Sequence, residues 1–432
     1  MRIAYFTPVS PQKTGIADYS EREILPYLSK YCDIDVYIDQ GVKPTNPGLI
    51  NNFDCFSYDQ YKKNAHNYDI PLYQIGNSEY HGYIYDSLIK YPGITILHDI
   101  YLHGLLWSQS LAKGDSKRYI SEFDYCYGDR GVKIAQDAIQ SGAYPEFTYP
   151  LIKRIIDKSL GVICHSEFGI NKVLTEQPKA ICTVIPQPFT IDCNRYEIEN
   201  SEKRHILQNW GIENKYPVLV SFGYISVHKR YDVILDVFKK ILEIFPHAHW
   251  VIIGQDKIDL KSRINEYGLK NHVIITGYVS DETLIDIIKI SDFCVNLRYP
   301  TAGETSRSIL QIMSLGKPVI VSNIGWFSEL PNNSCFKVDV DSYQDTVLLE
   351  FFKLLTEERK ISTVIGKNAK EYIIKNHDPE FVAKRYYEFI NNILNGDEII
   401  MNKISRSFIE LGLNENDDEL MKYQIHKMKG LL

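Results

Sequence analysis

The sequence predicts an α/β protein with two domains, each built on a parallel sheet. The chain has 432 residues, more than one ordinary hydrophobic core holds. Its composition, 44% hydrophobic and 24% charged, is typical of globular proteins. Short β-branched segments alternate with amphipathic helical segments in two separate stretches, a pattern typical of parallel sheets covered by helices. We therefore expect two facing Rossmann-like domains with an interdomain cleft.

The first stretch predicts a domain over residues 1–195. Its expected strands end in small or polar residues and lie at 2–6, 33–38, 73–77, 94–99 and 161–166. Amphipathic segments separate them, such as a helix over 19–31 that Asp18 is expected to cap. A large tyrosine-containing helical insertion is expected within 105–150. Because ligands of parallel sheets gather at the carboxyl ends of the strands, polar residues there are the first site candidates.

The second stretch predicts a domain over residues 205–376. Its expected strands lie at 217–224, 248–254, 272–278, 292–298, 318–322 and 335–340. The polar segment 193–215 suits an interdomain connection. Residues 377–396 are expected to form a C-terminal helix that crosses back to the N-terminal domain, and 397–432 a charged, helical tail.

Charge and cysteine usage exclude several classes of protein. The net charge of −7 argues against a nucleic-acid partner held on a broad basic face. Eight scattered cysteines form no C-x-x-C pair, which favours buried free thiols over zinc sites or disulfides. No apolar run reaches the roughly 18 residues of a membrane span, and the N-terminus lacks the features of a signal peptide. A cytoplasmic protein is expected.

The stretch RYPTAGETSRSILQIMSLGKPVIVS leads from an expected strand into an expected helix. Gly303 permits a sharp turn, and Thr305 and Ser306 suit the start of a helix. Free backbone N–H groups at such a start attract anions, and Arg307 adds a positive charge. Glu304 can accept hydrogen bonds from the hydroxyl groups of a ligand. Simple helix capping accounts for the same residues, so both interpretations stay open at this point.

A second candidate site lies in the stretch ITILHDIYLHG. His98 and Asp99 follow a strand at its carboxyl end, where sites form in parallel sheets. Asn77 and His81, after the preceding strand, can line the same pocket. A single histidine is usually structural, but the combination of His98, Asp99 and His103 favours contact with a ligand.

The stretch GETSRSILQIMSLGKPVIVS resembles the C-domain signature of family 4 retaining glycosyltransferases, which have the GT-B fold. The family pattern is E-G-F-G-L-P-x-L-E-A-M-A-x-G-x-P-V-I, and the residues in register with it are Leu310, Met313, Gly316, Pro318, Val319 and Ile320. The order of elements agrees over nearly the whole chain. This match is specific for the family and says little about the substrate.

The sequence departs from the family pattern at its two acids. These acids stand eight positions apart in the family and map onto Gly303 and Gln311. The first acid is displaced by one residue to Glu304, in a G-E-T-S variant associated with a subgroup of the family. The resemblance implies that Glu304 binds sugar hydroxyls of the donor. Gln311 stands where the family binds the ribose, and although neutral it can still hydrogen-bond a diol.

The stretch SFGYISVHKRYDVIL resembles the family's G-R-L-x-x-x-K-G turn, whose arginine and lysine clamp a diphosphate. Lys229 matches the lysine, whereas Tyr224 stands in place of the arginine. His228 or Arg230 would supply the second charge. A cation suits this position because a leaving nucleoside diphosphate develops negative charge. The alternative is a basic helix start at the surface, which the helix dipole disfavours without an anion.

The resemblance assigns further roles by position. Gly15 corresponds to a glycine loop that approaches the donor from the N-terminal domain, and the base would lie near Tyr278 and Val279. The implied donor-binding residues are Gly15, Tyr224, Lys229, Arg230, Tyr278, Val279, Thr305, Ser306, Arg307 and Gln311. The implied catalytic residues are Glu304, Lys229 and His98, and the implied acceptor-binding residues are Asn77, His81, Asp99 and His103.

The implied reaction moves a sugar from a nucleotide sugar to a glycan or lipid-linked acceptor with retention, in surface polysaccharide synthesis. A lipid-linked acceptor would bring peripheral contact with the inner face of a membrane. No cofactor and no metal are expected, because the acids of two D-x-D sequences, 33–35 and 339–341, suit a strand edge and a helix cap. The oligomeric state is open.

Two other classes of function remain. A non-catalytic partner subunit of the same fold fits the departures at Tyr224 and Gln311. A nucleotide-sugar epimerase fits less well, because it needs a general acid/base pair at the sugar, which neither Glu304 nor the His98–Asp99 pair supplies from sequence alone.

Overall fold

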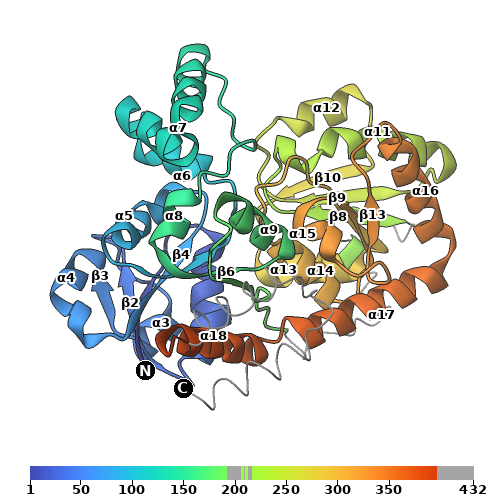
Figure 1. Cartoon of the computed structure of the whole chain (residues 1–432). Coiled ribbons are helices and arrows are strands. Elements are labelled where there is room, and N and C mark those ends of the chain that lie inside the picture. Colours follow the sequence, from blue (N-terminus) through green and yellow to red (C-terminus); the bar gives the residue numbers. More distant parts are fainter. Residues whose placement is uncertain (192–205, 209, 213–216, 397–432) are drawn as a thin grey trace, which may run out of the picture. The chain divides into compact units, whose positions relative to one another are not determined.

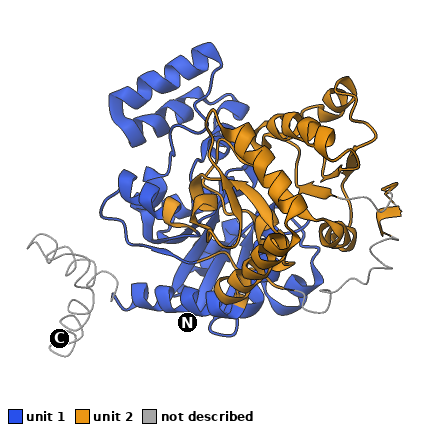
Figure 2. Cartoon of the chain, turned by 90° about the vertical axis from the view of Figure 1, so that its right-hand side faces the viewer, with its two compact units in different colours: residues 1–165, 169–185, 380–432 blue, residues 166–168, 186–379 orange. Residues whose placement is uncertain are grey.

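The computed structural model describes residues 1–191, 206–208, 210–212 and 217–396. The chain divides into two compact units (Figure 2). Unit 1 comprises Met1–His165, Gly169–Ile185 and the chain from Glu380, and unit 2 comprises Ser166–Phe168 and Pro186–Pro379. The predicted tail over 397–432 and most of the predicted connection over 193–215 lie outside the described residues.

Unit 1 contains a seven-stranded parallel sheet with the order β3-β2-β1-β4-β5-β6-β7 (Figure 1). The strands are β1 Arg2–Phe6, β2 Asp33–Ile38, β3 Cys55–Ser57, β4 Ile70–Ile75, β5 Gly93–Leu97, β6 Ser159–Cys164 and β7 Cys182–Val184. All five predicted strands are present, although β4 begins and ends earlier than expected. Strands β3 and β7 were not predicted, because three half-buried residues give no periodic signal.

The helices of unit 1 are α1 Gly15–Asp18, the π-helix η1 Tyr19–Ile24, α2 Leu25–Leu28, α3 Pro47–Asn52, η2 Tyr58–Gln60, α4 Tyr61–Asn64, η3 Ala65–Asn67, η4 Glu79–His81, α5 Gly82–Lys90, α6 His103–Gln109, η5 Leu111–Lys113, α7 Ser116–Ser141, α8 Lys153–Lys158 and α18 Pro379–Leu394. Helix α9, Glu167–Glu176, follows β6.

The first helical segment differs from the prediction. It begins at Gly15, because the extended residue Thr14 accepts a hydrogen bond from the N–H of Ile16 as N-cap. The expectation that Asp18 caps a helix from Tyr19 is therefore wrong. Asp18 lies inside the helical segment and pairs with Arg22, 3.6 Å away.

Helix α18 packs into unit 1, although it comes from the end of the described chain (Figure 1). Tyr386 Oη lies 2.7 Å from Tyr19 Oη, and Phe389 lies so close to Gly161 that an added Cβ would be 3.0 Å from its ring. The unit boundary falls after Ile185, before the expected residue 195. Phe189 belongs to the core of unit 2, where its N–H donates to His377 O.

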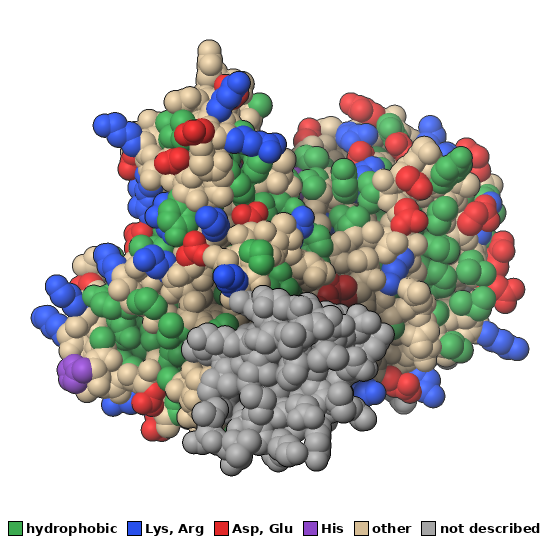
Figure 3. All heavy atoms as spheres, in the orientation of Figure 1, with side chains coloured by type: hydrophobic (Ala, Val, Ile, Leu, Met, Phe, Trp, Pro, Cys, Tyr) green, Lys and Arg blue, Asp and Glu red, His purple; other side chains and the backbone are tan. Residues whose placement is uncertain are grey.

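The predicted insertion is helical and stands out from unit 1 (Figure 1). Helix α7 is interrupted at Gly128, whose φ of 60° and ψ of −148° are not helical. The two arms pack around a small core of Leu106, Tyr119, Phe123, Cys126, Ala135 and Leu151. On the face shown in Figure 3, basic and acidic side chains are intermixed over the insertion.

Unit 2 contains a six-stranded parallel sheet with the order β10-β9-β8-β11-β12-β13. All six strands were predicted: β8 Val218–Phe222, β9 His249–Ile253, β10 Val273–Gly277, β11 Phe293–Asn296, β12 Val319–Ser322 and β13 Phe336–Val338. The helices are η7 Val227–Lys229, α11 Tyr231–Ile244, α12 Leu260–Glu266, α13 Asp281–Ile290, α14 Arg307–Ser314, α15 Gly325–Glu329, α16 Gln344–Glu357 and α17 Arg359–Asn376. Two hydrophobic clusters form its core, one including Val220 and Met313, the other Leu219 and Trp250.

A contact between two glycines fixes how α17 packs beside α14. Gly316 follows α14 with a φ of +68°, and its carbonyl oxygen would lie 2.0 Å from a Cβ added at Gly366 of α17. The backbones therefore approach more closely than any side chain would allow.

We predict that Gly366→Ala destabilises the protein. In an exposed helix this change gains about 1 kcal/mol from helix propensity. Here the added methyl group meets a backbone carbonyl, so we expect a net loss of about 1–3 kcal/mol, seen as a lower melting temperature. Lys367→Ala on the exposed side of the same helix is the control and should change stability by less than about 0.5 kcal/mol. Equal or higher stability of Gly366→Ala would contradict the prediction.

Candidate functional site

The first cluster of candidate residues lies in unit 2, at the carboxyl end of β8. Lys229 is 7% exposed, and its Nζ donates to Phe222 O at 2.6 Å. A Cβ added at Gly223 would lie 2.3 Å from that Nζ, and Gly223 has a φ of +104°. Glycine is thus required both for the backbone conformation and for the space that the ammonium occupies. The sequence selected Lys229 through its motif but gave no sign of its burial.

Two charged residues of the loop after β11 act on this lysine. Burial and the positive charge of Arg298 lower the pKa of Lys229, Glu304 partly opposes them, and the resulting pKa is about 7. Near neutral pH the group therefore holds its proton weakly. An anion bound beside it would raise the pKa again.

Glu304 is held within its own loop. Its Oε2 accepts hydrogen bonds from Thr301 Oγ1 and Ala302 N, each at 2.8 Å, and its Oε1 lies 3.0 Å from Arg298 Nε. Gly303 has the positive φ that the turn requires, 81°. The displaced acid therefore orients Arg298. Its predicted contact with sugar hydroxyls stays a prediction.

The start of α14 differs from a simple capped helix. The helix begins at Arg307, and Ser306 makes no side-chain cap hydrogen bond. Instead, the Ser306 and Ser308 hydroxyls lie 2.9 Å apart. Among the described residues, Asn296 Oδ1 and Thr305 Oγ1 are buried without a hydrogen-bond partner. The capping interpretation is therefore disfavoured, because these polar groups are oriented but unsatisfied.

The other donor-site candidates contact aromatic rings or solvent. Arg230 has a left-handed backbone and lies 5.7 Å from the ring centroid of Tyr299. Arg307 lies 5.2 Å from the ring centroid of Phe189. Three further candidates are placed as follows: Tyr224 is 60% exposed, Tyr278 after β10 is 91% exposed with Val279 beside it, and Gln311 is half-buried on α14.

The second cluster lies in unit 1 at the carboxyl ends of β4, β5 and β6. His98 Nε2 lies 2.6 Å from Gln74 Oε1, and His81 Nδ1 lies 2.9 Å from Gln74 O. The rings of His98 and His165 have centroids 4.9 Å apart, and Tyr19 of the π-helix meets His98 edge-on at 4.6 Å. Gly15, at the start of α1, has open space around its Cα.

Burial keeps these imidazoles neutral. It lowers the pKa of His81 to about 4. Burial, together with His165 and His81, lowers the pKa of His98 well below its usual range. His98 is therefore not a cation at neutral pH.

The remaining acceptor candidates have structural contacts. Asn77 N–H donates to Asp99 Oδ2 at 2.8 Å, and Asn77 Oδ1 accepts from the N–H of Leu105 in the first turn of α6 at 3.0 Å. His103 Nε2 lies 2.8 Å from Tyr119 Oη and faces the insertion. The structure thus groups His81 with His98, and directs His103 elsewhere.

Three residues of these clusters were not selected from the sequence: Gln74, His165 and Arg298. Gln74 is the one polar residue among the six of β4, IPLYQI, all of which are buried. A polar side chain in a buried strand must find a partner, and that signal was available. His165 and Arg298 follow the ends of β6 and β11, as site residues of parallel sheets commonly do.

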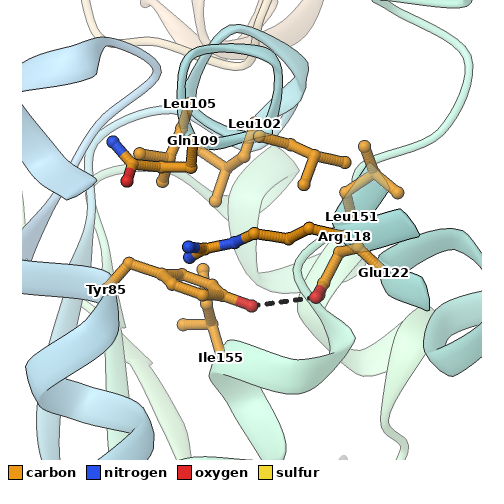
Figure 4. A pocket seen from close by; sticks show the side chains of 9 residues that line it. Tyr85, Leu102, Leu105, Gln109, Arg118, Glu122, Leu151 and Ile155 are labelled. Carbon is orange, nitrogen blue, oxygen red and sulfur yellow. Dashed lines mark hydrogen bonds between the residues drawn. The ribbon is translucent and has the colours of Figure 1, made fainter. Parts of the chain in front are cut away.

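A small hollow lies at the base of the insertion (Figure 4). Its volume is about 300 Å³, partly open to solvent, and it is lined by Tyr85, Leu102, Leu105, Leu106, Gln109, Arg118, Glu122, Leu151 and Ile155. Glu122 Oε2 accepts from Tyr85 Oη at 2.9 Å and from Arg154 Nε at 2.8 Å. Burial raises the pKa of Glu122. These two hydrogen bonds of Glu122 join the insertion to Tyr85 of α5 and Arg154 of α8.

The D-x-D acids have structural partners. Asp35 binds Arg2 and the Tyr68 hydroxyl, each at 2.7 Å. Asp341 caps a turn at the N–H of Tyr343, and Asp339 accepts from Asn323. Within the described ranges, no group of three or more histidines, cysteines or acids could hold a metal ion. The seven cysteines that the structure describes are free thiols.

The described part of the chain contains no helix long and apolar enough to span a membrane.

Comparison with known proteins links the chain to glycosyltransferases. Residues 202–372 match the family model of glycosyl transferases group 1. Over 147 residues the chain is 31% identical to mannosylfructose-phosphate synthase of Agrobacterium fabrum, covering 31% of each chain. Over 249 residues it is 21% identical to lipopolysaccharide 1,2-N-acetylglucosaminetransferase of Salmonella typhimurium, covering 55% of this chain and 63% of that one. These alignments thus span about a third to under two thirds of the curated relatives.

Solved structures resemble nearly the whole chain. HepE of Anabaena, in complex with UDP, has a TM-score of 0.64 at 16% identity and covers 91% of this chain and 100% of its own. WaaG, a glycosyltransferase involved in lipopolysaccharide biosynthesis, has a TM-score of 0.59 at 13% identity and covers 90% and 99%. The GT-B fold and the resemblance to glycosyltransferases are confirmed. The G-E-T-S subgroup stays a prediction.

We predict that Lys229→Met raises stability in a pH-dependent way. The folded-state pKa of Lys229, about 7, lies below the ordinary lysine pKa of 10.5, so between these values the unfolded chain binds a proton that the folded chain does not. Wild-type stability should therefore rise with pH in this window, by up to about 1.4 kcal/mol per pH unit from this group. The variant should melt higher than wild type, by the largest margin at pH 7 and below. The margin should shrink towards pH 9.

Melting curves of both proteins from pH 6 to pH 9 measure this margin. Exposed Lys240→Met is the matched control and should follow wild type at every pH. A margin that stays constant with pH, or a variant that melts lower throughout, would show that Lys229 is not a destabilising buried amine.

Proposed function

We propose that the chain, whose unit 2 contains the match to group 1 glycosyltransferases, moves a sugar from a nucleoside-diphosphate sugar to an acceptor hydroxyl with retention. The observation that carries this proposal is the buried ammonium of Lys229 beside Arg298. When Lys229 is protonated, the two cations and the one carboxylate, Glu304, leave net positive charge in a partly desolvated place. Such an arrangement suits an anion that arrives with its own negative charge.

A diphosphate leaving group provides such an anion. In the proposed step, the bond between the anomeric carbon and the diphosphate oxygen breaks, and a bond from the acceptor oxygen forms on the same face. The acceptor's proton passes to a phosphate oxygen. Lys229, Arg298 and the uncapped amides before α14 would stabilise the charge that develops on the diphosphate. No metal is needed in this proposal.

The donor would bind to unit 2. Solved structures with the same fold contain UDP or UDP-glucose, which supports a nucleotide sugar as partner. Tyr278 and Val279 would lie at the base, and Gln311 at the ribose. Arg230 and Arg307 would lie beside the diphosphate.

The acceptor is proposed to be a glycan or a lipid-linked sugar in surface polysaccharide synthesis. The Salmonella relative and WaaG, both named for lipopolysaccharide synthesis, support this class. We place the protein in the cytoplasm, with peripheral contact at the inner face of the membrane. Asn77, His81, Asp99 and His103 stay the predicted acceptor contacts, and each of them also holds a hydrogen bond within unit 1.

A non-catalytic partner subunit is the second candidate. It is favoured by the engagement of the Glu304 carboxylate within its own loop, together with Tyr224 and Gln311 at positions where the family pattern has charged residues. Such a protein would bind the nucleotide sugar without turnover.

We predict that one nucleoside diphosphate binds with uptake of a proton. Titration calorimetry with UDP, GDP, dTDP, ADP and CMP, at pH 8 in two buffers of different ionisation enthalpy, measures binding and proton uptake together. Because an anion raises the pKa of Lys229 from about 7, binding should take up close to one proton at pH 8. Lys229→Met should weaken binding by at least about tenfold and abolish the uptake.

Lys240→Met is again the control and should bind as wild type does. No binding by any nucleotide would contradict the proposed function. Binding without hydrolysis or transfer, across lipid-linked and free glycan acceptors, would favour the partner-subunit alternative.

A further inference from the structure

We propose that Gln74 fixes His98 as a hydrogen-bond acceptor towards ligand, so that His98 recognises a neutral hydroxyl and not a phosphate or carboxylate oxygen. Gln74 is then a positioning residue that acts through the imidazole. The inference rests on the proposed function only for the identity of the ligand as a sugar or a sugar acceptor. The protonation state itself is a property of unit 1 alone.

The contact between Gln74 and His98 assigns the imidazole proton. Gln74 is fully buried in β4, and its Oε1 lies 2.6 Å from His98 Nε2. An amide oxygen accepts hydrogen bonds and cannot donate, so Nε2 must carry a hydrogen. The side chain lies with its oxygen towards His98, and its amide nitrogen, also buried, has no hydrogen-bond partner among the described residues.

The neighbouring histidines carry their protons on the other nitrogen. His81 Nδ1 lies 2.9 Å from Gln74 O, and His165 Nδ1 lies 2.8 Å from Ile185 O. Both partners are carbonyl oxygens, so each Nδ1 donates. Gln74 thus holds two imidazoles in opposite tautomers, one through its side chain and one through its backbone.

A second proton on His98 is disfavoured by everything packed against it. The ring of His165 lies 4.9 Å away, Tyr19 covers another side at 4.6 Å, and His81 contributes further positive charge if protonated. A cation here would be desolvated, and Gln74, its hydrogen-bond partner, is neutral. His98 therefore stays neutral, and its Nδ1 remains unprotonated.

His98 is half-buried, and the hydrogen bond found for its ring among the described residues is the one at Nε2, so Nδ1 is the nitrogen left for a ligand. An unprotonated ring nitrogen accepts a hydrogen bond from an alcohol and repels an anionic oxygen. His98 thus contacts a hydroxyl of the bound sugar or acceptor and does not serve as a general acid. With its pKa held low, it orients that hydroxyl more than it removes the proton.

The experiment measures the tautomer directly. Protein labelled with ¹⁵N-histidine is examined by long-range ¹H–¹⁵N NMR from pH 5.5 to 8, without ligand, and the His98→Asn variant identifies the signals of His98. We expect the Nε2–H tautomer, unprotonated at Nδ1, over the whole range. A signal of the Nδ1–H tautomer, or of a cation within this range, would overturn the proposal.

Two variants of Gln74 test its role. Gln74→Met keeps the size but removes the acceptor, so His98 should populate both tautomers. Gln74→Glu places a carboxylate beside Nε2, so the apparent pKa of His98 should rise by at least one unit relative to wild type. Unchanged tautomer and titration in both variants would show that Gln74 only fills space.

Folding is checked by melting each variant. If Gln74→Met does not fold, Gln74→Glu and the wild-type spectrum still decide the question. Because these spectra need no substrate, they are independent of whether any nucleotide binds. The tautomer can be refuted while the transferase proposal stands, and the reverse.

Discussion

The buried ammonium of Lys229 is the constraint around which the binding end of unit 2 is organised. An amine inside a protein costs free energy unless its hydrogen bonds and its charge are compensated. Here Phe222 O supplies one hydrogen bond, Gly223 leaves the space, and Glu304 supplies a single negative charge that is shared with Arg298. The compensation is incomplete without a ligand, as the lowered pKa shows. A protein without an anionic partner would gain stability by replacing this lysine.

Unit 1 uses a different strategy at its own strand ends. Its imidazoles are neutral, and their orientation is set by hydrogen bonds to oxygens that can accept a hydrogen but not donate one. Gln74 serves two imidazoles, while the π-turn places Tyr19 against the ring of His98. Widened helical turns of this kind recur at functional sites because they move side chains off the regular helical positions. Charge dominates one unit and directional hydrogen bonding the other.

Most of the fold could be predicted, because alternating β-branched and amphipathic segments follow directly from burial in a covered parallel sheet. The short strands β3 and β7 could not be predicted, because three residues are too few to show a hydrophobic periodicity. The displaced helix start at Gly15 was missed because the capping strength of Thr14 and Asp18 is similar in sequence. Lys229 was found through its motif. Arg298 was missed because its role depends on Glu304, and Gln74 because its role depends on His98. Local sequence does not show which side chains from separate strands and loops come into contact.

The return of α18 to unit 1 has a consequence for how the chain is made. Six residues of this helix belong to the main core of unit 1: Val382, Ala383, Tyr386, Phe389, Ile390 and Ile393. On the ribosome, the segment synthesised first therefore waits for the helix synthesised near the end, whereas the segment between can complete its own core beforehand. Until α18 emerges, the apolar surface around Tyr19 and Gly161 is exposed to water and to other nascent chains. Unit 1 is thus the first unit to begin synthesis and the last to complete its core.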